Sequence, residues 1–195
     1  VVFTSTCAVY GDAFRGGSLV QEVAPAQPRS PYGAVKFFEE NLIRQMMETA
    51  VILRLGNVFS HLADPSTGCH GVITDFRGQM LKGEPVTIFG GGDGGLRDYI
   101  HVYEVCKAIT KGLECKDADG GVFNVGTGIG TSVRELEGMM REACPCEVGV
   151  PVDGEPRGGD VDAVVLDTQK ARAVLGFKPW AGNSLEKRIT AGIFD

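Results

Sequence analysis

The sequence has no long hydrophobic run and no excess of basic residues, and each absence excludes a class of protein. No stretch approaches the roughly eighteen continuous apolar residues of a membrane-spanning helix, so we expect no membrane partner. Lys and Arg number 19 against 25 Asp and Glu, which gives a net charge of -6. A general nucleic-acid binder needs a basic face, so this balance argues against nucleic acid as a partner. An anionic ligand would have to be held by local arginines.

Cysteine pairs with metal-binding spacing are also missing. None of the six cysteines belongs to a Cys-x-x-Cys pair of the kind that binds structural zinc. Cys144 and Cys146 stand too close together for that spacing, and the Cys69-His70 pair has no obvious partners. We therefore predict no metal site, and we expect reduced thiols in a cytoplasmic protein.

Apolar residues are present in the proportion that a globular core needs, and they occur in alternating strand-like and helix-like runs. The chain of 195 residues is 43% hydrophobic and 23% charged. Strands are predicted for residues 1–5, 51–55, 86–89, 99–102, 122–125 and 147–150. Helices are predicted for residues 31–48, 72–82, 103–114, 132–143, 168–175 and 184–193. This alternation favours an α/β fold with a parallel sheet and short connections.

A hydroxyl-rich segment after the first strand and a Tyr-x-x-x-Lys pair on the first helix give the clearest chemical signal. The first is TSTCAVYG at residues 4–11, and the second is SPYGAVK at residues 30–36, in which a Ser-Pro pair begins the helix. Residues four apart on a helix project from the same face, so the Lys36 ammonium can lie near the Tyr32 phenol and lower its pKa from about 10. A tyrosine tuned in this way can act as a general base near neutral pH.

The same helix carries apolar residues at steps of three and four. They are Val35, Phe38, Leu42 and Met46. We therefore expect one face of the helix to pack against the rest of the protein, while another face presents the tyrosine and the lysine.

With these segments the chain resembles the extended short-chain dehydrogenase/reductase family, and within it the NAD-dependent nucleotide-sugar epimerases and dehydratases. Further segments match that family in the family's order: LRLGNVF at 53–59, the run from IFG to RDYIHV at 88–102, FNVGTG at 123–128 and PRGGD at 156–160. The resemblance covers nearly the whole chain. Several ordered matches are far more specific than any one of them.

The resemblance implies an α/β fold in which part of a Rossmann-like parallel sheet is joined to a smaller α/β substrate-binding lobe. It assigns residues 1–59 and 100–131 to the NAD-binding domain, and residues 60–99 and 132–195 to the nucleotide-sugar lobe. The cofactor implied is NAD, and the partner implied is a second copy of the chain, bound through the helix that carries Tyr32.

The opening that this family uses to bind the cofactor pyrophosphate is not in the sequence. Family members begin with a strand, a glycine-rich turn and a helix, whereas this chain starts without a methionine, inside what should be a central strand. We therefore interpret the chain as a fragment that lacks about the first hundred residues of that architecture. The GTGIG run at 126–130 is an imperfect glycine pattern, because Thr131 stands at the expected third glycine, and it matches the exit turn of the last Rossmann strand.

The resemblance also implies roles for individual residues. Thr6, Tyr32 and Lys36 match the catalytic positions, and Ser5, Tyr32 and Lys36 match positions that bind NAD. Tyr32 would take a proton from the sugar 4-hydroxyl, Lys36 would hold the phenolate charge, and Thr6 would hydrogen-bond the 4-oxygen. The substrate-binding positions are Thr6, Asn57, Arg97, Arg157 and Asp160.

Some of these positions have simpler interpretations that stay open. The guanidinium groups of Arg97 and Arg157 suit phosphate oxygens. Arg97 and Asp98 can equally form a surface ion pair, and Arg157 can belong to an ordinary turn. Tyr99 is a weaker match, and His101 lies in an apolar strand, where we expect a structural role.

The pair Cys7-Ala8 distinguishes branches of the family. Dehydratases and decarboxylating members resemble each other in having an acidic residue here, and neither Cys7 nor Ala8 can act as a carboxylate acid. This favours epimerisation at C4 of a nucleotide sugar of the UDP-glucose/UDP-galactose type, as in galactose metabolism. Two alternatives stay open: a 4,6-dehydratase or other extended-family member, and a non-catalytic remnant that binds sugar nucleotides. Val164 matches a position near the sugar C2 substituent, where a small side chain would also admit an N-acetyl group.

Overall fold

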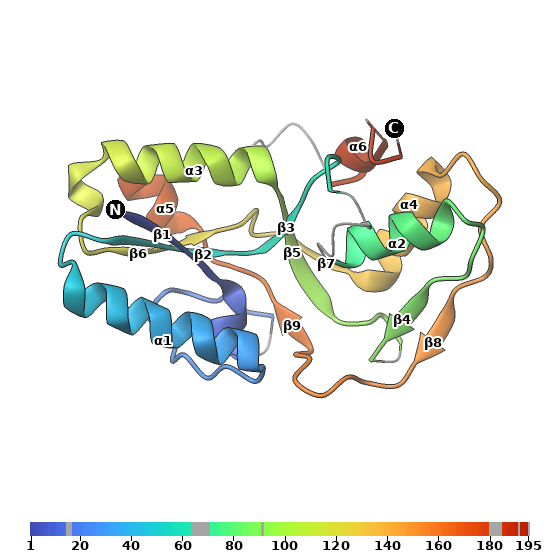
Figure 1. Ribbon diagram of the computed structural model, residues 1–195, viewed down its shortest axis with the longest axis horizontal. Helices are drawn as coiled ribbons and strands as arrows, with labels where there is room; N and C mark the ends of the chain where they lie inside the picture. Colours follow the sequence, from blue (N-terminus) through green and yellow to red (C-terminus); the bar gives the residue numbers. More distant parts are fainter. Residues whose placement is uncertain (15–16, 64–70, 91, 180–184, 191, 195) are drawn as a thin grey trace.

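The computed structural model describes residues 1–14, 17–63, 71–90, 92–179, 185–190 and 192–194. Two halves lie side by side along the long axis of the molecule (Figure 1). A three-stranded parallel sheet covered by helices forms the first half, and helices with a two-stranded sheet form the second. A further sheet lies between them. The alternation of strands and helices confirms the predicted α/β class.

The first half is built on strands in the order β1, β2, β6. Strand β1 (Val2–Thr6) pairs in parallel with β2 (Val51–Leu55), and β2 pairs in parallel with β6 (Val122–Val125). Helix α1 (Pro31–Met46) covers one face of this sheet, and α3 (Val102–Glu114) and α5 (Gln169–Leu175) cover the other (Figure 1). Short 3-10 turns follow β1 and α3, namely η1 (Cys7–Tyr10) and η3 (Lys116–Ala118).

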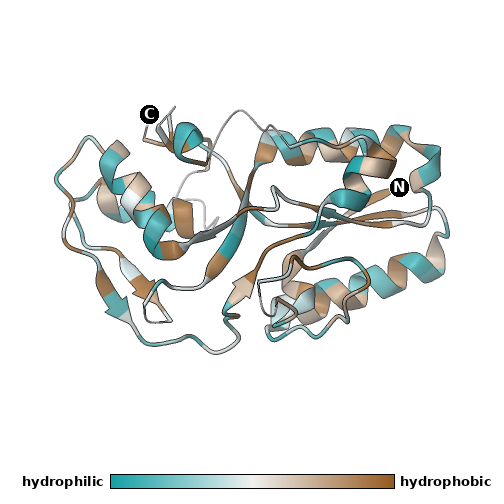
Figure 2. Ribbon diagram, turned by 180° about the vertical axis from the view of Figure 1, so that it is seen from behind, coloured by the Kyte–Doolittle hydropathy of each residue, from teal (hydrophilic) through white to brown (hydrophobic). Residues whose placement is uncertain are grey.

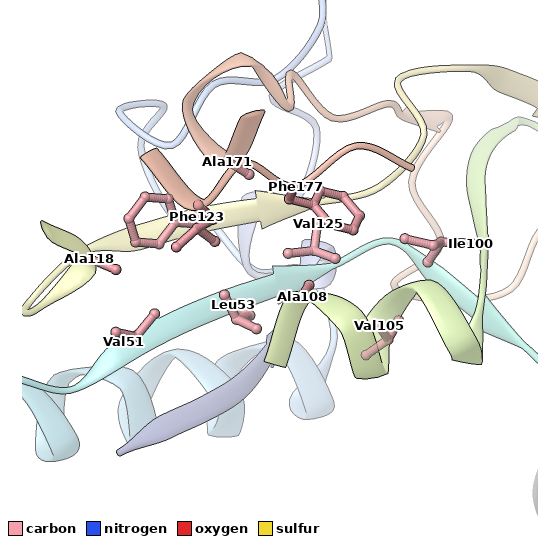
Figure 3. Close-up of a cluster of buried hydrophobic side chains, with 11 residues drawn as sticks. Val51, Leu53, Ile100, Val105, Ala108, Ala118, Phe123, Val125, Ala171 and Phe177 are labelled. Carbon is pink, nitrogen blue, oxygen red and sulfur yellow. The ribbon is translucent and has the colours of Figure 1, made fainter. Parts of the chain in front are cut away.

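The core of the first half lies between β2, β6, α3 and α5. Figure 3 shows Leu53 of β2 and Phe123 and Val125 of β6 in one cluster with Ala108 of α3 and Phe177, which follows α5. All five side chains are at most 1% exposed. Burying a side chain of this size contributes about 1.5 to 3 kcal/mol, so this cluster fixes α3 and α5 on the sheet.

Strand β5 (Leu96–His101) organises the sheet between the halves. It pairs in parallel with β3 (Asn57–Phe59) and β9 (Ala163–Val164), and antiparallel with β7 (Gly130–Ser132). In the second half, β4 (Thr87–Phe89) pairs in parallel with β8 (Val152–Gly154).

Helices α2, α4 and α6 enclose the core of the second half. Their bounds are α2 (Val72–Met80), α4 (Val133–Ala143) and α6 (Leu185–Thr190). Met80, Leu136, Met140 and Ile189 are buried there together with Ile88 of β4. None of the described helices is both long and apolar enough to cross a bilayer.

Helix α1 begins as the sequence predicts, but its apolar stripe faces outward. The Ser30 hydroxyl accepts from the Gly33 N–H at 3.1 Å, and Pro31 takes the first helical position. Figure 2 shows α1 as alternating hydrophilic and hydrophobic segments. The buried residues of α1 are Gly33 and Glu40. The predicted packing residues are exposed instead, with fractions of 56, 66, 44 and 74% for Val35, Phe38, Leu42 and Met46. The prediction was wrong because periodicity identifies an apolar face but not what covers it.

The predicted strand at 147–150 was also wrong, because those residues are irregular and β8 begins at Val152. Arg141 of α4 donates to the carbonyl oxygens of Val148 and Gly149 at 2.9 and 2.8 Å. These carbonyls therefore bind a side chain instead of a neighbouring strand.

Other differences concern element ends and short strands. The strand expected at 99–102 begins three residues earlier, at Leu96, and β3, β7 and β9 were not predicted. The helix expected at 184–193 is observed at Leu185–Thr190, and residues 184 and 191 lie outside the described part of the chain, as do Cys69 and His70. The five described cysteines are free.

Candidate active site

Two adjoining cavities border β3 and β5 of the sheet that lies between the halves of the molecule. The smaller, of about 320 Å³, is lined by Ser5, Thr6 and Tyr32. The larger, of about 510 Å³, is lined by Arg97, Arg157 and Asp160. Asn57, Val72 and Tyr99 line both. The structure thus places every site residue predicted from the sequence on these cavities, with the exception of Lys36.

The smaller cavity lies at the carboxyl end of β1, where ligands of parallel α/β sheets usually bind. Thr6 ends the strand and caps η1, because its Oγ1 accepts from the Ala8 N–H at 3.2 Å. Its own hydroxyl proton can still be donated to a ligand. The Ser5 hydroxyl donates to the Glu40 carboxylate of α1, and its oxygen can still accept.

Tyr32 and Lys36 occupy different surroundings on α1. Tyr32 is 61% exposed in the first turn and lines the smaller cavity. The Lys36 ammonium forms a 2.9 Å ion pair with Glu39 and lies over the Phe3 ring, 4.1 Å from its centroid. The structure therefore places the lysine against β1, one turn of α1 after the tyrosine.

Strand β5 supplies residues to the cavities from one of its faces. Side chains alternate along a strand, so Arg97 points away from Asp98. The Arg97 Nη1 donates to the carbonyl oxygens of Leu96 and Asp162 at 3.0 and 3.5 Å, and its guanidinium lines the larger cavity. The interpretation of Arg97 and Asp98 as a surface ion pair was wrong, because Asp98 is only 1% exposed and binds other groups.

Asp98 holds the turn after β6 in place. Its carboxylate accepts from the Thr127 N–H and hydroxyl at 2.8 and 2.6 Å, from the Gly128 N–H at 3.0 Å and from the Leu166 N–H at 3.3 Å. Burial raises the pKa of Asp98, and these hydrogen bonds partly oppose that shift. The GTGIG run is therefore a turn fastened to β5, which fixes the position of the strand that carries Arg97 and Tyr99.

Tyr99 has a buried hydroxyl with no hydrogen-bond partner among the described residues. It lies opposite Asn57 in the β3–β5 register and borders both cavities. Burial raises the pKa of Tyr99 to about 12, so it is a neutral donor at physiological pH. An unpaired buried hydroxyl costs about 1 to 3 kcal/mol, which a polar ligand in the cavities would recover.

The larger cavity ends at an arginine that stacks on an aromatic ring. The Arg157 guanidinium lies 4.1 Å from the centroid of Phe89, and its Nε is 3.4 Å from Asp160. Gln79 of α2 and Lys82, which follows α2, also line this cavity. No sequence motif marks Gln79 or Lys82, because only the packing of α2 brings this part of the chain to the cavity.

Three other positions raised by the sequence have structural surroundings. Burial, with a smaller contribution from the charge of Asp98, raises the pKa of Cys7 to about 12, and its thiol lies 3.8 Å from Asn57 Oδ1. Val164 is 3% exposed and packs in a cluster with Cys7, away from the lining of both cavities. The His101 Nδ1 accepts from the Tyr103 N–H at 3.2 Å and so caps α3.

Comparisons with known proteins point to one family. The model of the NAD dependent epimerase/dehydratase family matches residues 1–126. A putative UDP-glucose 4-epimerase of Methanocaldococcus jannaschii is 37% identical over 92% of this chain and 57% of its own length. The UDP-glucose 4-epimerase of Thermotoga maritima, solved with UDP-glucose, is 34% identical with a TM-score of 0.86, over 98% of this chain and 61% of its own.

A third comparison concerns the cofactor. The Thermus thermophilus UDP-glucose 4-epimerase, solved in complex with NAD, is 34% identical with a TM-score of 0.82, over 98% of this chain and 62% of that one. The chain thus spans about three fifths of the length of the relatives it matches.

Proposed function

Since the chain belongs to the NAD dependent epimerase/dehydratase family, we propose that it carries the catalytic and sugar-binding part of an enzyme that inverts C4 of a nucleotide sugar. One observation carries this proposal. Several hydroxyl side chains line the smaller cavity and two arginines line the larger one, and the two cavities share lining residues. A nucleotide sugar has the complementary form, with an uncharged sugar next to a diphosphate.

The larger cavity suits the nucleotide end of this substrate. Arg97 and Arg157 would bind the diphosphate, because guanidinium groups form paired hydrogen bonds with phosphate oxygens. Asn57 and the neutral Tyr99 hydroxyl lie between the cavities and would bind the same oxygens from the side. Asp160 would accept from a ribose hydroxyl. The net charge of -6 makes such a local grip necessary for a dianionic ligand.

The smaller cavity suits the reacting sugar and the nicotinamide end of NAD. Ser5, Tyr32 and Lys36 would hold that end of the cofactor, which accepts the C4 hydride and later returns it to the other face of the sugar. Ser5 and Tyr32 fit it because they place hydroxyl groups on the cavity at the carboxyl end of a parallel strand, and Lys36 follows Tyr32 by one turn of α1.

Proton transfer at the sugar 4-oxygen falls to Tyr32 and Thr6. Tyr32, as phenolate, would take the 4-hydroxyl proton as the C4 hydride leaves, and would return it when the hydride comes back. Thr6 would donate its free hydroxyl proton to the 4-oxygen. Lys36 would exchange its contact with Glu39 for the phenolate, whose charge it would balance.

A 4-epimerase fits the smaller cavity better than a 4,6-dehydratase. A dehydratase needs an acid near the sugar C5 and C6, and none of the described residues lining this cavity is Asp or Glu. Cys7 offers no substitute, because its thiol is buried and its raised pKa keeps it protonated.

We also propose that α1 is a dimer interface. Its outward stripe of Val35, Phe38, Leu42 and Met46 leaves four large apolar side chains exposed along one helix. Contiguous apolar patches of this kind mark interaction sites in soluble proteins. A second copy of the chain can cover the stripe with its own α1, because a two-fold axis places the same face on both subunits.

The test is conversion of UDP-galactose by the full-length protein with NAD, beside a Tyr32→Phe variant. Conversion to UDP-glucose that is lost in the variant would support the epimerase. A 4-keto-6-deoxy product would support the dehydratase instead. Binding of UDP-sugars without turnover by the wild-type protein would show a non-catalytic binder.

A further inference from the structure

Glu40 of α1 is a buried carboxylate that joins three elements next to the smaller cavity. It is 1% exposed and lies two turns after Tyr32. Arg54 of β2, itself 5% exposed, donates to it from Nη2 at 2.7 Å and from Nε at 3.0 and 3.3 Å. The Ser5 hydroxyl of β1 donates to the same carboxylate. One side chain of α1 is therefore bonded to two strands of the sheet that α1 covers.

The pair is well satisfied, so it holds a defined geometry. Burial acts to lower the pKa of Arg54, but hydrogen bonds from its guanidinium to Glu40 and its contact with Tyr10 outweigh burial and raise that pKa. The Arg54 Nη1 also donates to the Glu22 carbonyl at 3.3 Å, and the guanidinium lies 4.8 Å from the centroid of the Tyr10 ring. The guanidinium is thus held on several sides, and its two-point contact with Glu40 is directional.

A buried ion pair usually adds little to the free energy of unfolding. Replacing such a pair with apolar residues of similar volume is often neutral or stabilising, because the charges lose their hydration. A helix held only by apolar contacts can rotate or slide by small amounts, whereas the bonds from Glu40 to Ser5 and Arg54 define both its rotation and its register. The contribution of the pair is therefore orientation.

The orientation of α1 determines where Tyr32, at the start of the helix, lies relative to Thr6. Ser5 precedes Thr6, and Tyr32 lies eight residues before Glu40, about 12 Å along the helix axis. Near Tyr32 the helix also approaches η1, the turn that follows β1, because a Cβ at Gly33 would lie 2.6 Å from the Ala8 carbonyl oxygen. Contacts at both ends of the shared face thus fix how the tyrosine faces the threonine.

We infer that Glu40 and Arg54 are a positioning pair, which aligns the Tyr32 base with the Thr6 hydroxyl across the sugar 4-oxygen. This inference rests on the proposed epimerase function. Reacting groups must be held closely, and a displacement of about 1 Å costs about a hundredfold in rate. The pair touches neither substrate nor cofactor in this role, so its loss should lower kcat and leave substrate binding in the larger cavity unchanged.

The decisive variant is Glu40→Met/Arg54→Met in the full-length protein, with UDP-galactose as substrate. We expect a folded protein with a Tm close to that of wild type, a kcat reduced about a hundredfold, and a KM within threefold. The matched control is Glu137→Met/Arg141→Met, a partly buried pair within α4 at 2.6 Å, which should keep its kcat within threefold if folded. A stable Glu40→Met/Arg54→Met protein with wild-type kcat would overturn the inference.

Two further measurements keep the inference testable. If the double variant does not fold, Glu40→Asp keeps the charge but is shorter by one methylene, and we expect it to fold with kcat at least tenfold lower. Wild-type kcat in Glu40→Asp would also overturn the inference. If the wild-type protein has no epimerase activity, the proposed function fails separately. Amide hydrogen exchange then decides, because residues 31–36 should lose protection in the double variant while β2 keeps it, and unchanged protection of 31–36 would refute the role.

Discussion

Replacing His101 with asparagine should remove much of the acid sensitivity of folding. His101 is 5% exposed, and its Nδ1 accepts the Tyr103 N–H at the start of α3. Burial, with the charges of Arg188 and His61, lowers the pKa of His101 to about 4, against an opposing effect of Glu104. Asparagine keeps an oxygen that can cap the helix but does not titrate.

The direction of the pH effect on stability follows from whether the folded or the unfolded state binds the proton more readily. An unfolded histidine takes up a proton near pH 6.5, whereas the folded one resists until about pH 4. The stability contributed by neutral His101 is therefore fully present above pH 6.5 and is lost as the pH falls towards 4. From these two pKa values the loss is about 2 kcal/mol at pH 5 and about 3 kcal/mol at pH 4.

The assay is urea unfolding of wild type and His101→Asn at several pH values between 7 and 4. At pH 7 the variant should be less stable by about 1 kcal/mol, because it loses the ring contacts of His101 with Phe59 and Tyr103. Other titrating groups contribute equally to both proteins and cancel in the difference. As the pH falls, the wild type should lose its advantage and become the less stable protein below about pH 6. Parallel curves for the two proteins would refute the reasoning.

Three shorter predictions concern the site and the assembly. Tyr32→Phe should lower kcat by about 10² to 10⁴ with KM within threefold, as measured by UDP-galactose conversion; a fall below tenfold would exclude the tyrosine as base. Tyr99→Phe should leave the free energy of unfolding unchanged or slightly higher, because the Tyr99 hydroxyl has no partner among the described residues. The same variant should bind UDP-glucose about fivefold to tenfold more weakly, as measured by calorimetry. Unchanged affinity would place the hydroxyl outside the binding site. Phe38→Glu places a charge in the exposed stripe of α1, so it should turn a dimer into a monomer, as measured by sedimentation velocity. A variant that stays dimeric would locate the interface elsewhere.

Elements with a local signal at their ends could be predicted from the sequence. Helix α1 has a Ser-Pro start, and α4 has a capping box in which Ser132 and Glu135 each bind the other's backbone N–H. Helix α5 ends at Gly176, whose φ of 59° suits a residue without a side chain. Each signal depends on neighbours within four residues, so it can be recognised in the sequence without knowledge of the tertiary structure.

The short strands could not be predicted, because their existence depends on a partner. Strands β7 and β9 have three and two residues, and each is defined by its pairing with β5. Residues 147–150 have a strand-like pattern but bind Arg141, a side chain that arrives from α4. A propensity of a few tenths of a kcal/mol per residue is easily outweighed by such tertiary contacts.

Many of the residues that line the two cavities could be named from the sequence, but the contacts of those side chains could not. Motif positions pointed to Thr6, Tyr32 and Arg97, each in a short segment with a recognisable order, and all three line the two cavities. The position of Lys36 over the Phe3 ring is set by how α1 lies on β1, which spacing along a helix does not give, whereas its ion pair with Glu39 is a local i,i+3 contact. The stacking of Arg157 on Phe89 likewise joins segments that only the fold brings together.

Helix α1 shows why an apolar stripe alone does not identify a core face. Its inner side is held by Glu40, which satisfies its charge with Arg54 and so can be buried without an apolar neighbour. Its outer side carries Phe38 and Met46, which no described part of the chain covers. A hydrophobic-moment argument assumes that polar residues face water, and a buried ion pair reverses that assumption. The apolar face expected to pack inward is then exposed, where we propose that it binds a second subunit, while we infer that the polar face orients Tyr32.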